Sequence, residues 1–394
     1  MFMMQHNIIK PLPKRFHSLD AVRGIAALSV VLYHWQHFFY QGISPQKYDY
    51  RAQPFYSLFA LFYQKGWSAV DLFFSLSGFI FYWLYAEAIK ERRISGREFF
   101  VLRFSRLYPL HILTLLIVWV EQMAAKNLTG SFSVYPNNDL YHFILNIFFI
   151  SNWGFNKGVS FNAPIWSVSI EVFLYIIFFL ISFLGGARSI WITLSMILLS
   201  FFLHFLPYIM SLGIFCFFLG GAMFLLYEKL TRFDLKKLTI LFGSITLLLW
   251  VTAIIFLKEK PLSRIPGLHE FTHLYKAIDL GSFYFAPAIL FPVTILFLAI
   301  AETFRGSLGA RIGFIGDISY SSYLLHFPLQ LLFILILPYL HLGKEVFFSK
   351  IFFIIFFAIL IGLSLLSYHK FERPMQKLIR NRLRPQSKEK IQPA

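Results

Sequence analysis

The first apolar segment of the chain contains three ionisable residues. It reads SLDAVRGIAALSVVLYHW over residues 18–35 and includes Asp20, Arg23 and His34. At about 100° per residue, His34 returns to within about 20° of the direction of Arg23, and Asp20 precedes Arg23 by one turn. The face between them carries small residues: Gly24, Ala27 and Val31. An imidazole can act as a general base and a guanidinium can bind phosphate, so this face predicts one wall of a narrow reaction cavity. The alternative is two interfacial charges and a packing histidine.

Two carboxylates lie in later apolar segments. Asp71 in SAVDLFFSLSGF lies about 7 Å below the outer end of its segment, and Glu171 in NAPIWSVSIEVFLY lies about 10 Å below the outer end of its own. A carboxylate at that depth is costly, and is more often functional than structural. His34, Asp71 and Glu171 then lie at similar heights. We predict that His34 is within hydrogen-bonding or one-water reach of one of them, with Glu171 favoured. A helix cap or a contact with water is the alternative for Asp71.

An arginine pair opens the third apolar segment, RFSRLYPLH. Arg103 and Arg106 are three residues apart and share one face of a helix at its cytoplasmic end. Two guanidinium groups side by side can bind phosphate oxygens bidentately, so the pair predicts a phosphate clamp. The alternative is topological charge alone.

A further histidine, His326, occurs in ISYSSYLLHFPLQ, two residues before Pro328. The proline bends a helix and frees a backbone carbonyl. His326 is either a packing residue that donates to such a carbonyl or a catalytic residue.

The elements that must position these residues are membrane-spanning helices. The chain has 394 residues, of which 58% are hydrophobic and 14% charged, whereas soluble domains carry about 25% charged residues. We therefore expect an all-α, polytopic membrane helical bundle of about ten transmembrane helices. The predicted spans are 21–40, 66–88, 106–123, 164–184, 189–206, 209–227, 238–257, 283–302, 318–340 and 348–369.

The distribution of basic residues predicts the topology. Most of the 36 Lys and Arg residues fall on one side if both termini are cytoplasmic and the short apolar run 140–153 does not cross the membrane. The net charge of +17 is then topological, and we expect no nucleic-acid partner. The expected divisions are a cytoplasmic basic tail (1–17), a transmembrane domain (18–369) and a second cytoplasmic basic tail (370–394) that is disordered at its end. The single Cys216 excludes an intrachain disulfide.

These stretches together resemble the acyltransferase-3 family of membrane acyltransferases, which O-acylate bacterial polysaccharides, peptidoglycan and some small molecules. The matching stretches are LDAVRGIAALSVVLYH, VDLFFSLSGFIF, RFSRLYP, PIWSVSIEVFLY and ISYSSYLLHFPL, in the family's order. The resemblance implies that Arg23 and His34 are the family's essential Arg/His pair. It also implies that Arg103 and Arg106 form its Arg-x-x-Arg motif, and that Glu171 is its acidic residue.

The expected activity is acyl transfer in the bacterial cytoplasmic (inner) membrane. The donor is acetyl-CoA or another cytoplasmic acyl-CoA, held at Arg23, Arg103 and Arg106, and no metal is expected. The acceptor is a hydroxyl of an extracytoplasmic or lipid-linked glycan, which His34 deprotonates as general base while Asp71 or Glu171 orients its ring. A covalent acyl-enzyme is an open alternative. Besides membrane lipids, a separate periplasmic acyl-transfer protein is an expected partner, because many family members carry a C-terminal extracytoplasmic domain that this sequence lacks.

A different class of function uses the same residue types. Buried Asp, Glu and His also serve proton relays, so the alternative is a proton-coupled transporter or flippase of a lipid-linked glycan. The sequence lacks the paired Gly- or Pro-broken spans in two matching halves that transporters often show, and this favours the enzyme.

Overall fold

The structure is a computed structural model that describes residues 13–41, 44–45, 48–203, 207–259 and 284–383. The first part of the predicted N-terminal tail and the end of the predicted C-terminal tail lie outside these residues. The described α-helices, in chain order, are α1 (His17–Tyr33), α2 (Tyr56–Lys65), α3 (Ala69–Phe81), α4 (Glu87–Lys90), α5 (Gly96–Thr129), α6 (Leu140–Ile147), α7 (Trp166–Phe183), α8 (Ile190–Phe202), α9 (Tyr208–Leu230), α10 (Leu235–Glu259), α12 (Phe291–Arg305), α13 (Gly313–Asp317), α14 (Ser319–Ile336), α15 (Lys350–Ser367) and α16 (Arg373–Leu383).

Short turns of 3₁₀- or π-helix link or extend these helices. They are η1 (His34–Phe39), η2 (Tyr50–Ala52), η3 (Gly66–Ser68), η4 (Tyr82–Ala86), η5 (Ala163–Ile165), η6 (Gly186–Arg188), η9 (Ala286–Leu290), η10 (Ala310–Ile312), η11 (Leu337–Leu340), η12 (Lys344–Phe348) and η13 (Tyr368–Glu372). Two short strands, β1 (Tyr40–Gln41) and β2 (Ser44–Pro45), pair antiparallel.

The prediction of a polytopic helical membrane protein is confirmed. Within the described residues, 8 helices are long and apolar enough to cross a membrane. The other two predicted spans correspond to α1, with 17 residues, and α8, with 13 residues. The helix α1 continues into the six residues of η1. In the run 140–153 the helix α6 has 8 residues and is about 12 Å long, too short to cross, as we expected.

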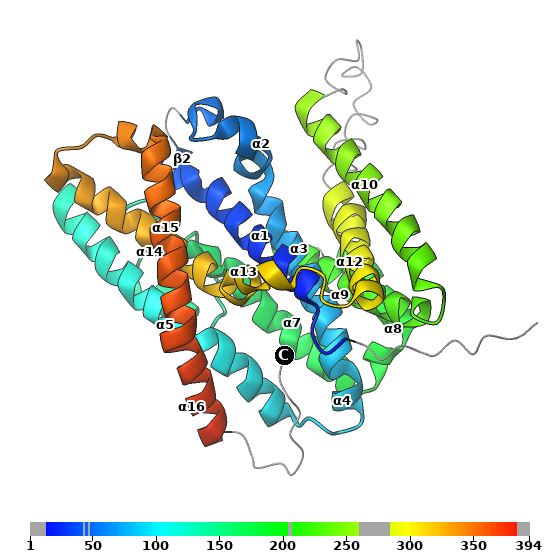
Figure 1. Cartoon of the computed structure of the whole chain (residues 1–394). Helices are drawn as coiled ribbons and strands as arrows, with labels where there is room; N and C mark the ends of the chain where they lie inside the picture. The colour runs from blue at the N-terminus through cyan, green and yellow to red at the C-terminus, as the bar shows by residue number, and fades with distance from the viewer. Residues whose placement is uncertain (1–12, 42–43, 46–47, 204–206, 260–283, 384–394) are drawn as a thin grey trace, which may run out of the picture.

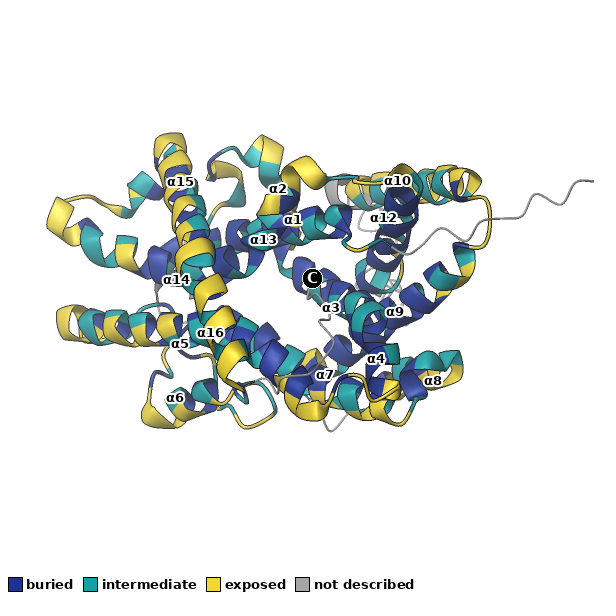
Figure 2. Ribbon diagram, turned by 60° about the horizontal axis from the view of Figure 1, so that its bottom comes forward, coloured by how far each residue is buried: buried dark blue, intermediate teal, exposed yellow. Residues whose placement is uncertain are grey.

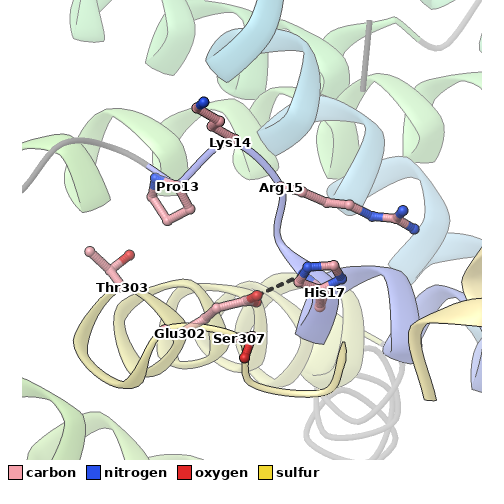
Figure 3. Close-up of a pocket in the computed structure, with 8 residues that line it drawn as sticks. Pro13, Lys14, Arg15, His17, Glu302, Thr303 and Ser307 are labelled. Atoms are coloured by element: carbon pink, nitrogen blue, oxygen red, sulfur yellow. Dashed lines mark hydrogen bonds between the residues drawn. The ribbon is translucent and has the colours of Figure 1, made fainter. Parts of the chain in front are cut away.

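Local sequence signals explain where the helices begin and end. The side chain of Ser95 accepts a hydrogen bond from the backbone N–H of Glu98, and Gly130, with a φ of 77°, follows the last residue of α5. These are a helix N-cap and a glycine C-cap. The start of α1 is capped by a side chain of another helix. Glu302 on α12 accepts hydrogen bonds from the backbone N–H groups of His17 (2.8 Å) and Ser18 (2.9 Å) and from the Ser18 hydroxyl (2.6 Å), beside an open cavity of about 430 Å³ (Figure 3).

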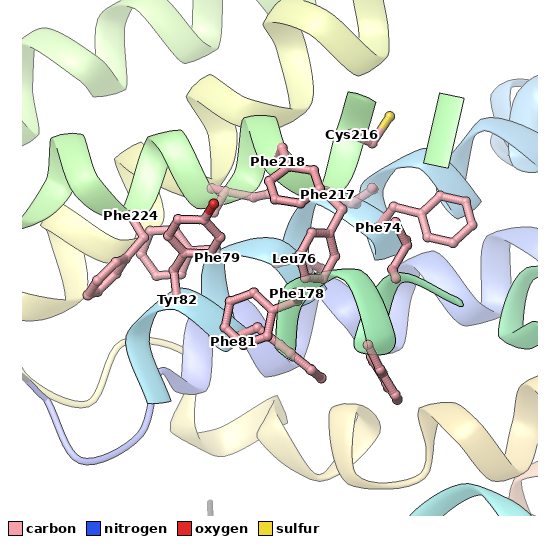
Figure 4. Packing of buried hydrophobic residues seen from close by; sticks show 14 of the residues in the cluster. Phe74, Leu76, Phe79, Phe81, Tyr82, Phe178, Cys216, Phe217, Phe218 and Phe224 are labelled. Carbon is pink, nitrogen blue, oxygen red and sulfur yellow. The ribbon is translucent and has the colours of Figure 1, made fainter. Parts of the chain in front are cut away.

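The centre of the bundle is formed by α3 and α9, which carry mostly buried residues (Figure 2). Glycines allow their close approach: a Cβ atom on Gly78 would overlap the Phe217 carbonyl, and one on Gly220 would overlap the Ser75 carbonyl. Small residues of this kind let membrane helices pack backbone to backbone. Around this contact Phe79, Phe178 and other aromatic rings interdigitate (Figure 4).

The bundle has two distinct ends. In Figure 1, α2 and β2 lie at one end, and α4 and α16 lie at the other. The helix α15 runs through η13 directly into α16, which packs on α5, so the chain remains helical beyond residue 369. Basic residues of the α4–α5 connection and of α16 gather at the same end. That distribution fits the predicted cytoplasmic side, which remains a prediction.

Candidate active site

A cavity of about 300 Å³ lies where α1 ends and η1 begins. Its walls include His34, His37 and Tyr40 from this segment, Tyr135 from the α5–α6 connection, and residues between Asn146 and Trp166. In η1 the helix tightens to three residues per turn, which places residues i and i+3 directly above one another. The rings of His34 and His37 accordingly stack, with centroids 4.6 Å apart and an interplanar angle of 18°. We call this cavity the histidine pocket.

His34 is held by a second histidine. Its Nδ1 lies 2.9 Å from Nε2 of His326 on α14, while Nδ1 of His326 lies 2.6 Å from the carbonyl oxygen of Tyr323. A carbonyl can only accept, so His326 carries its proton on Nδ1, and its bare Nε2 accepts from Nδ1–H of His34. The Nε2 of neutral His34 is therefore unprotonated. It has no hydrogen-bond partner among the described residues and is not fully enclosed, so it is the nitrogen available to act as a base.

His326 does not donate to the carbonyl that Pro328 frees, which was the packing role considered for it. Pro328 removes the hydrogen bond to the carbonyl of residue 324, but that carbonyl accepts from Asn162 Nδ2 at 3.0 Å. His326 donates instead to Tyr323, and its other nitrogen binds His34. Both nitrogens of His326 are thus used to orient the pocket histidine.

The second pocket histidine is held in the same way by the next turn of α14. Gln330 Oε1 lies 3.1 Å from Nδ1 of His37, and Gln330 Nε2 donates to the backbone carbonyl of His34 at 3.0 Å. The amide oxygen can only accept, so His37 also carries its proton on Nδ1, and its Nε2 accepts from the hydroxyl of Tyr135 at 2.9 Å. The sequence analysis did not identify His37, Gln330 or Tyr135.

Tyr135 lies in a turn that is held by side-chain hydrogen bonds. The preceding residue, Val134, is buried and has a φ of 65°, a conformation that is rare for a β-branched residue. The Gln122 side chain holds Ser133 through both its carbonyl (2.8 Å) and its N–H (2.9 Å), and Asn138 donates to the Tyr135 carbonyl at 2.7 Å. Neighbouring contacts on both sides therefore impose the strained backbone that turns Tyr135 toward His37.

His34 was predicted to lie within hydrogen-bonding or one-water reach of a carboxylate, and the direct hydrogen bond is not found among the described residues. No hydrogen bond or ion pair joins His34 to Asp71 or Glu171 in the described part of the chain. Glu171 accepts from Ser77 Oγ at 2.7 Å and interacts with Arg103. Asp71 is buried on the side of α3 that faces Cys216, and its Oδ2 has no partner among the described residues. Counting residues gave heights along the helices, but the neighbouring helices decide the direction in which each carboxylate points.

The three predicted phosphate-binding arginines lie away from the histidine pocket, near the N-terminal end of α1. Arg23 is on α1, and Arg103 and Arg106 are on α5. Arg23 donates to Ser319 Oγ (3.1 Å) and to the Gly316 carbonyl (2.9 Å), and it forms an ion pair with Asp20 (2.9 Å). Arg23 also lies close enough to Arg106 for their like charges to interact. We call Arg23, Arg103 and Arg106 the arginine cluster.

The two arginines of α5 have different environments. Arg103 is buried and donates to the Tyr85 hydroxyl at 2.5 Å, with its guanidinium 5.2 Å from the Phe81 ring centroid. Arg106 is half-buried and makes no hydrogen bond or ion pair within the described residues, although its charge interacts with Glu372. Arg106 is thus the member of the cluster best placed to receive an external anion.

The small-residue face of α1 does not line an open channel over its first turns. Gly24 is buried where Ile315 of α13 packs against it, and a Cβ atom at Gly24 would overlap the Ile315 backbone. The helix α1 packs on α13 and α14 along this face. The expectation that these small residues form a cavity wall is therefore wrong at Gly24, where the space is filled by a neighbouring helix. Within the described residues no group of three or more His, Cys, Asp or Glu is arranged to hold a metal ion.

Comparison with known proteins identifies the family of this chain. Residues 16–368 match the model of the acyltransferase domain family. The chain is 37% identical over 106 residues to "Protein 2 in picA locus" of Rhizobium radiobacter, covering 27% of this chain and 45% of that protein. It is 30% identical over 168 residues to acyltransferase MdmB of Streptomyces mycarofaciens, covering 42% of this chain and 38% of that protein.

The chain thus spans less than half the length of each of these curated relatives, and no solved structure matches it. The family model, by contrast, extends from the residue before α1 to the residue after α15, a range that includes the histidine pocket and the arginine cluster. The resemblance seen in the motifs is confirmed, and this chain belongs to the acyltransferase-3 family of acyltransferase domains.

Proposed function

We propose that this protein transfers an acyl group, most simply acetyl, from cytoplasmic acyl-CoA to a hydroxyl of an extracytoplasmic or lipid-linked glycan. The observation that carries this proposal is His34, whose tautomer is set by His326 and whose Nε2 is free beside a cavity. A neutral imidazole with one fixed and one free nitrogen is suited to general-base catalysis. Membership of an acyltransferase family supports the reaction class.

The proposed reaction needs no group beyond donor, acceptor and His34. The acceptor hydroxyl gives its proton to His34 Nε2 while its oxygen attacks the thioester carbonyl carbon. A C–O bond forms, the C–S bond breaks, and the departing CoA sulfur takes the proton back from His34. The products are an ester and free CoA thiol. During the proton transfer, His326 keeps the His34 ring oriented by accepting from Nδ1–H, the positioning role that a carboxylate has in a triad.

The arginine cluster is the proposed donor site. His34 lies eleven residues after Arg23, about 16 Å along the helix axis, a distance comparable to the reach of the pantetheine arm of CoA. Arg106 provides an unpaired guanidinium for a phosphate, and Arg23 supports it from α1. We assign Arg103 and Glu171 an indirect role in this site, because each is held within the protein by neighbouring side chains. Asp71 remains a candidate without a contact to His34.

The test is thioester cleavage by the purified full-length protein in lipid nanodiscs. We expect slow release of free thiol from acetyl-CoA without acceptor. We also expect His34→Ala to lower that rate by at least ~10²-fold, as for loss of a general base, while acetyl-CoA still binds. The control is His341→Asn, which changes an exposed histidine with a φ of 54° to a residue that tolerates this conformation. A wild-type protein that cleaves no thioester, as expected of a transporter or flippase, would contradict the proposed function.

A further inference from the structure

The walls of the histidine pocket carry no formally charged side chain among the described residues. Among the described residues that line it, none is Asp, Glu, Lys or Arg, and its ionisable groups are two histidines and three tyrosines. A buried charge on a ligand needs an opposite charge in its site. The composition of the wall therefore selects against anionic and cationic groups in the part of the acceptor that enters.

Two asparagines of this wall have free amide groups. Asn152 and Asn156 are half-buried and line the pocket, and their side chains make no hydrogen bond within the described part of the chain. A primary amide offers two donors and one acceptor oxygen. Asn146 Nδ2, by contrast, donates to the His142 carbonyl at 2.8 Å. The amide of Gln36, which also lines the pocket, makes no hydrogen bond within the described residues either.

The segment that carries Asn152 is anchored on α7. The backbone N–H of Asn152 donates to Ser169 Oγ at 3.1 Å, and the indole N–H of Trp153 donates to the Ser169 carbonyl at 2.8 Å. Ser169 Oγ in turn donates to the carbonyl of Phe149 at 2.6 Å. Asn152 is therefore held in place on both sides, although its own side chain has no partner.

The segment that carries Asn156 is anchored on α6. The carbonyl of Phe155 accepts from the Tyr141 hydroxyl at 2.7 Å, and the N–H of Lys157 donates to His142 Nε2 at 3.2 Å. Both backbone neighbours of Asn156 are therefore fixed. Fixing two free amides before a ligand arrives lowers the entropy that binding must overcome.

Two further polar groups of the pocket can accept hydrogen bonds. His34 Nε2 is bare, and Tyr135 donates its proton to His37, which leaves its oxygen free to accept. Hydroxyl groups of a ligand can donate to these acceptors and also accept from the asparagine amides. Tyr33 and Trp166 add aromatic surface to the same wall. At about 300 Å³ the pocket is at the lower end of the ~300–1,000 Å³ range of small-molecule sites, which fits one ring.

We propose that Asn152 and Asn156 form the acceptor-binding subsite, which takes a single uncharged hydroxylated ring such as a neutral sugar unit. One hydroxyl of that ring lies at His34 Nε2 and others lie at the two amides. The proposal rests on the proposed function and adds residues that bind the acceptor without reacting.

The experiment measures acetyl transfer from radiolabelled acetyl-CoA by the full-length protein in nanodiscs. The neutral probes are methyl β-D-glucoside, methyl β-D-galactoside and methyl α-D-mannoside, and the charged probes are methyl glucuronide and methyl glucosaminide. We expect transfer to at least one neutral probe and at least tenfold lower kcat/KM for its charged counterparts. Asn152→Ala and Asn156→Ala should each raise the KM for that neutral probe about 5–10-fold, the effect of losing one or two hydrogen bonds.

Two controls separate this proposal from the proposed function. Asn127→Ala changes an exposed asparagine near the end of α5 and should leave the acceptor KM unchanged. Acceptor-independent thioester cleavage, which depends on His34, should be the same in all three asparagine variants. If that cleavage persists but no neutral probe is acetylated, or if both pocket variants keep the wild-type KM, the subsite is overturned while the proposed function stands. Loss of cleavage in the wild-type protein would instead contradict the proposed function.

Discussion

The Nδ1 atom of His34 on η1 lies 2.9 Å from Nε2 of His326 on α14, and the two ring planes are nearly parallel, with an interplanar angle of 9°. The pair joins residues 292 positions apart in the chain. Because Tyr323 fixes the proton of His326, this one contact also decides which nitrogen of His34 can act as a base. The partner is neutral, so His34 is oriented without the nearby negative charge that a carboxylate would add.

His326 should therefore matter through His34. We predict that His326→Ala lowers transfer by less than the ~10²–10⁴-fold typical of losing a general base, and that His326→Gln restores part of the activity, because a glutamine oxygen can accept from Nδ1–H. The pH dependence of kcat should shift in His326→Ala, because the base then loses its fixed tautomer. A profile identical to that of the wild-type protein, with reduced activity only, would assign His326 a packing role.

The arginine cluster predicts a difference between two neighbouring arginines. Arg106 has no hydrogen bond or ion pair among the described residues, so Arg106→Ala should weaken acyl-CoA binding, and more strongly at low salt than at high salt. Arg106→Lys should restore only part of the affinity, since a point charge cannot replace a bidentate fork. Binding is measured by calorimetry at two salt concentrations, with the exposed Arg382→Ala on α16 as control. Equal affinities for Arg106→Ala and the control would reduce Arg106 to topological charge.

Arg103→Ala should act mainly on stability. Arg103 is buried between aromatic rings and interacts with Glu171, so its removal leaves buried polar groups without a partner, at a cost of about 1–3 kcal/mol for each. We expect a lower apparent melting temperature and lower yield of the purified protein. Normal stability with lost acyl-CoA binding would instead place Arg103 in direct contact with the donor.

The sequence predicted the helices and their shared faces better than the contacts between helices. Helical periodicity correctly placed Arg23 with Asp20, because that relationship depends on one helix alone. The partner of His34 could not be obtained in this way, because it depends on how α14 packs beside α1. Tyr135 was missed because its turn has no periodicity, and its orientation follows from the φ of Val134. For Glu171 the depth estimate gave a height but not a direction, and its hydrogen-bond partner is Ser77.

The contact between α3 and α9 predicts a strong effect of single methyl groups. Ala at Gly78 or Gly220 would overlap a backbone carbonyl of the facing helix, and overpacking of this kind costs about 1–3 kcal/mol. Both variants should show a lower apparent melting temperature. Gly362→Ala on α15 is the matched control, since a Cβ atom there meets nothing within 4 Å, and helix propensity favours Ala by about 1 kcal/mol. Equal melting temperatures for all three variants would contradict the close approach.

Glu302 should stabilise the helix that carries His34. It accepts three hydrogen bonds from His17 and Ser18 at the start of α1, and a carboxylate at a helix N-terminus also interacts favourably with the helix dipole. Glu302→Ala leaves buried donors unpaired, at about 1–3 kcal/mol for each, so we expect a fall of several degrees in the apparent melting temperature at a fixed scan rate. Glu302→Gln keeps one acceptor oxygen, so its apparent melting temperature should fall less.

The comparison for Glu302 is Glu91→Ala, which removes an exposed ion pair with Arg93; such solvent-screened pairs contribute little to stability. If Glu302→Ala and Glu91→Ala melt alike, the start of α1 is held by its packing on α13 and not by this cap. Suppose that only Glu302→Ala lowers the melting temperature, while His34-dependent thioester cleavage per folded molecule stays normal. The cap then stabilises the helix without taking part in the reaction. That outcome would separate the groups that anchor α1 at its first turn from those that orient His34 at its last.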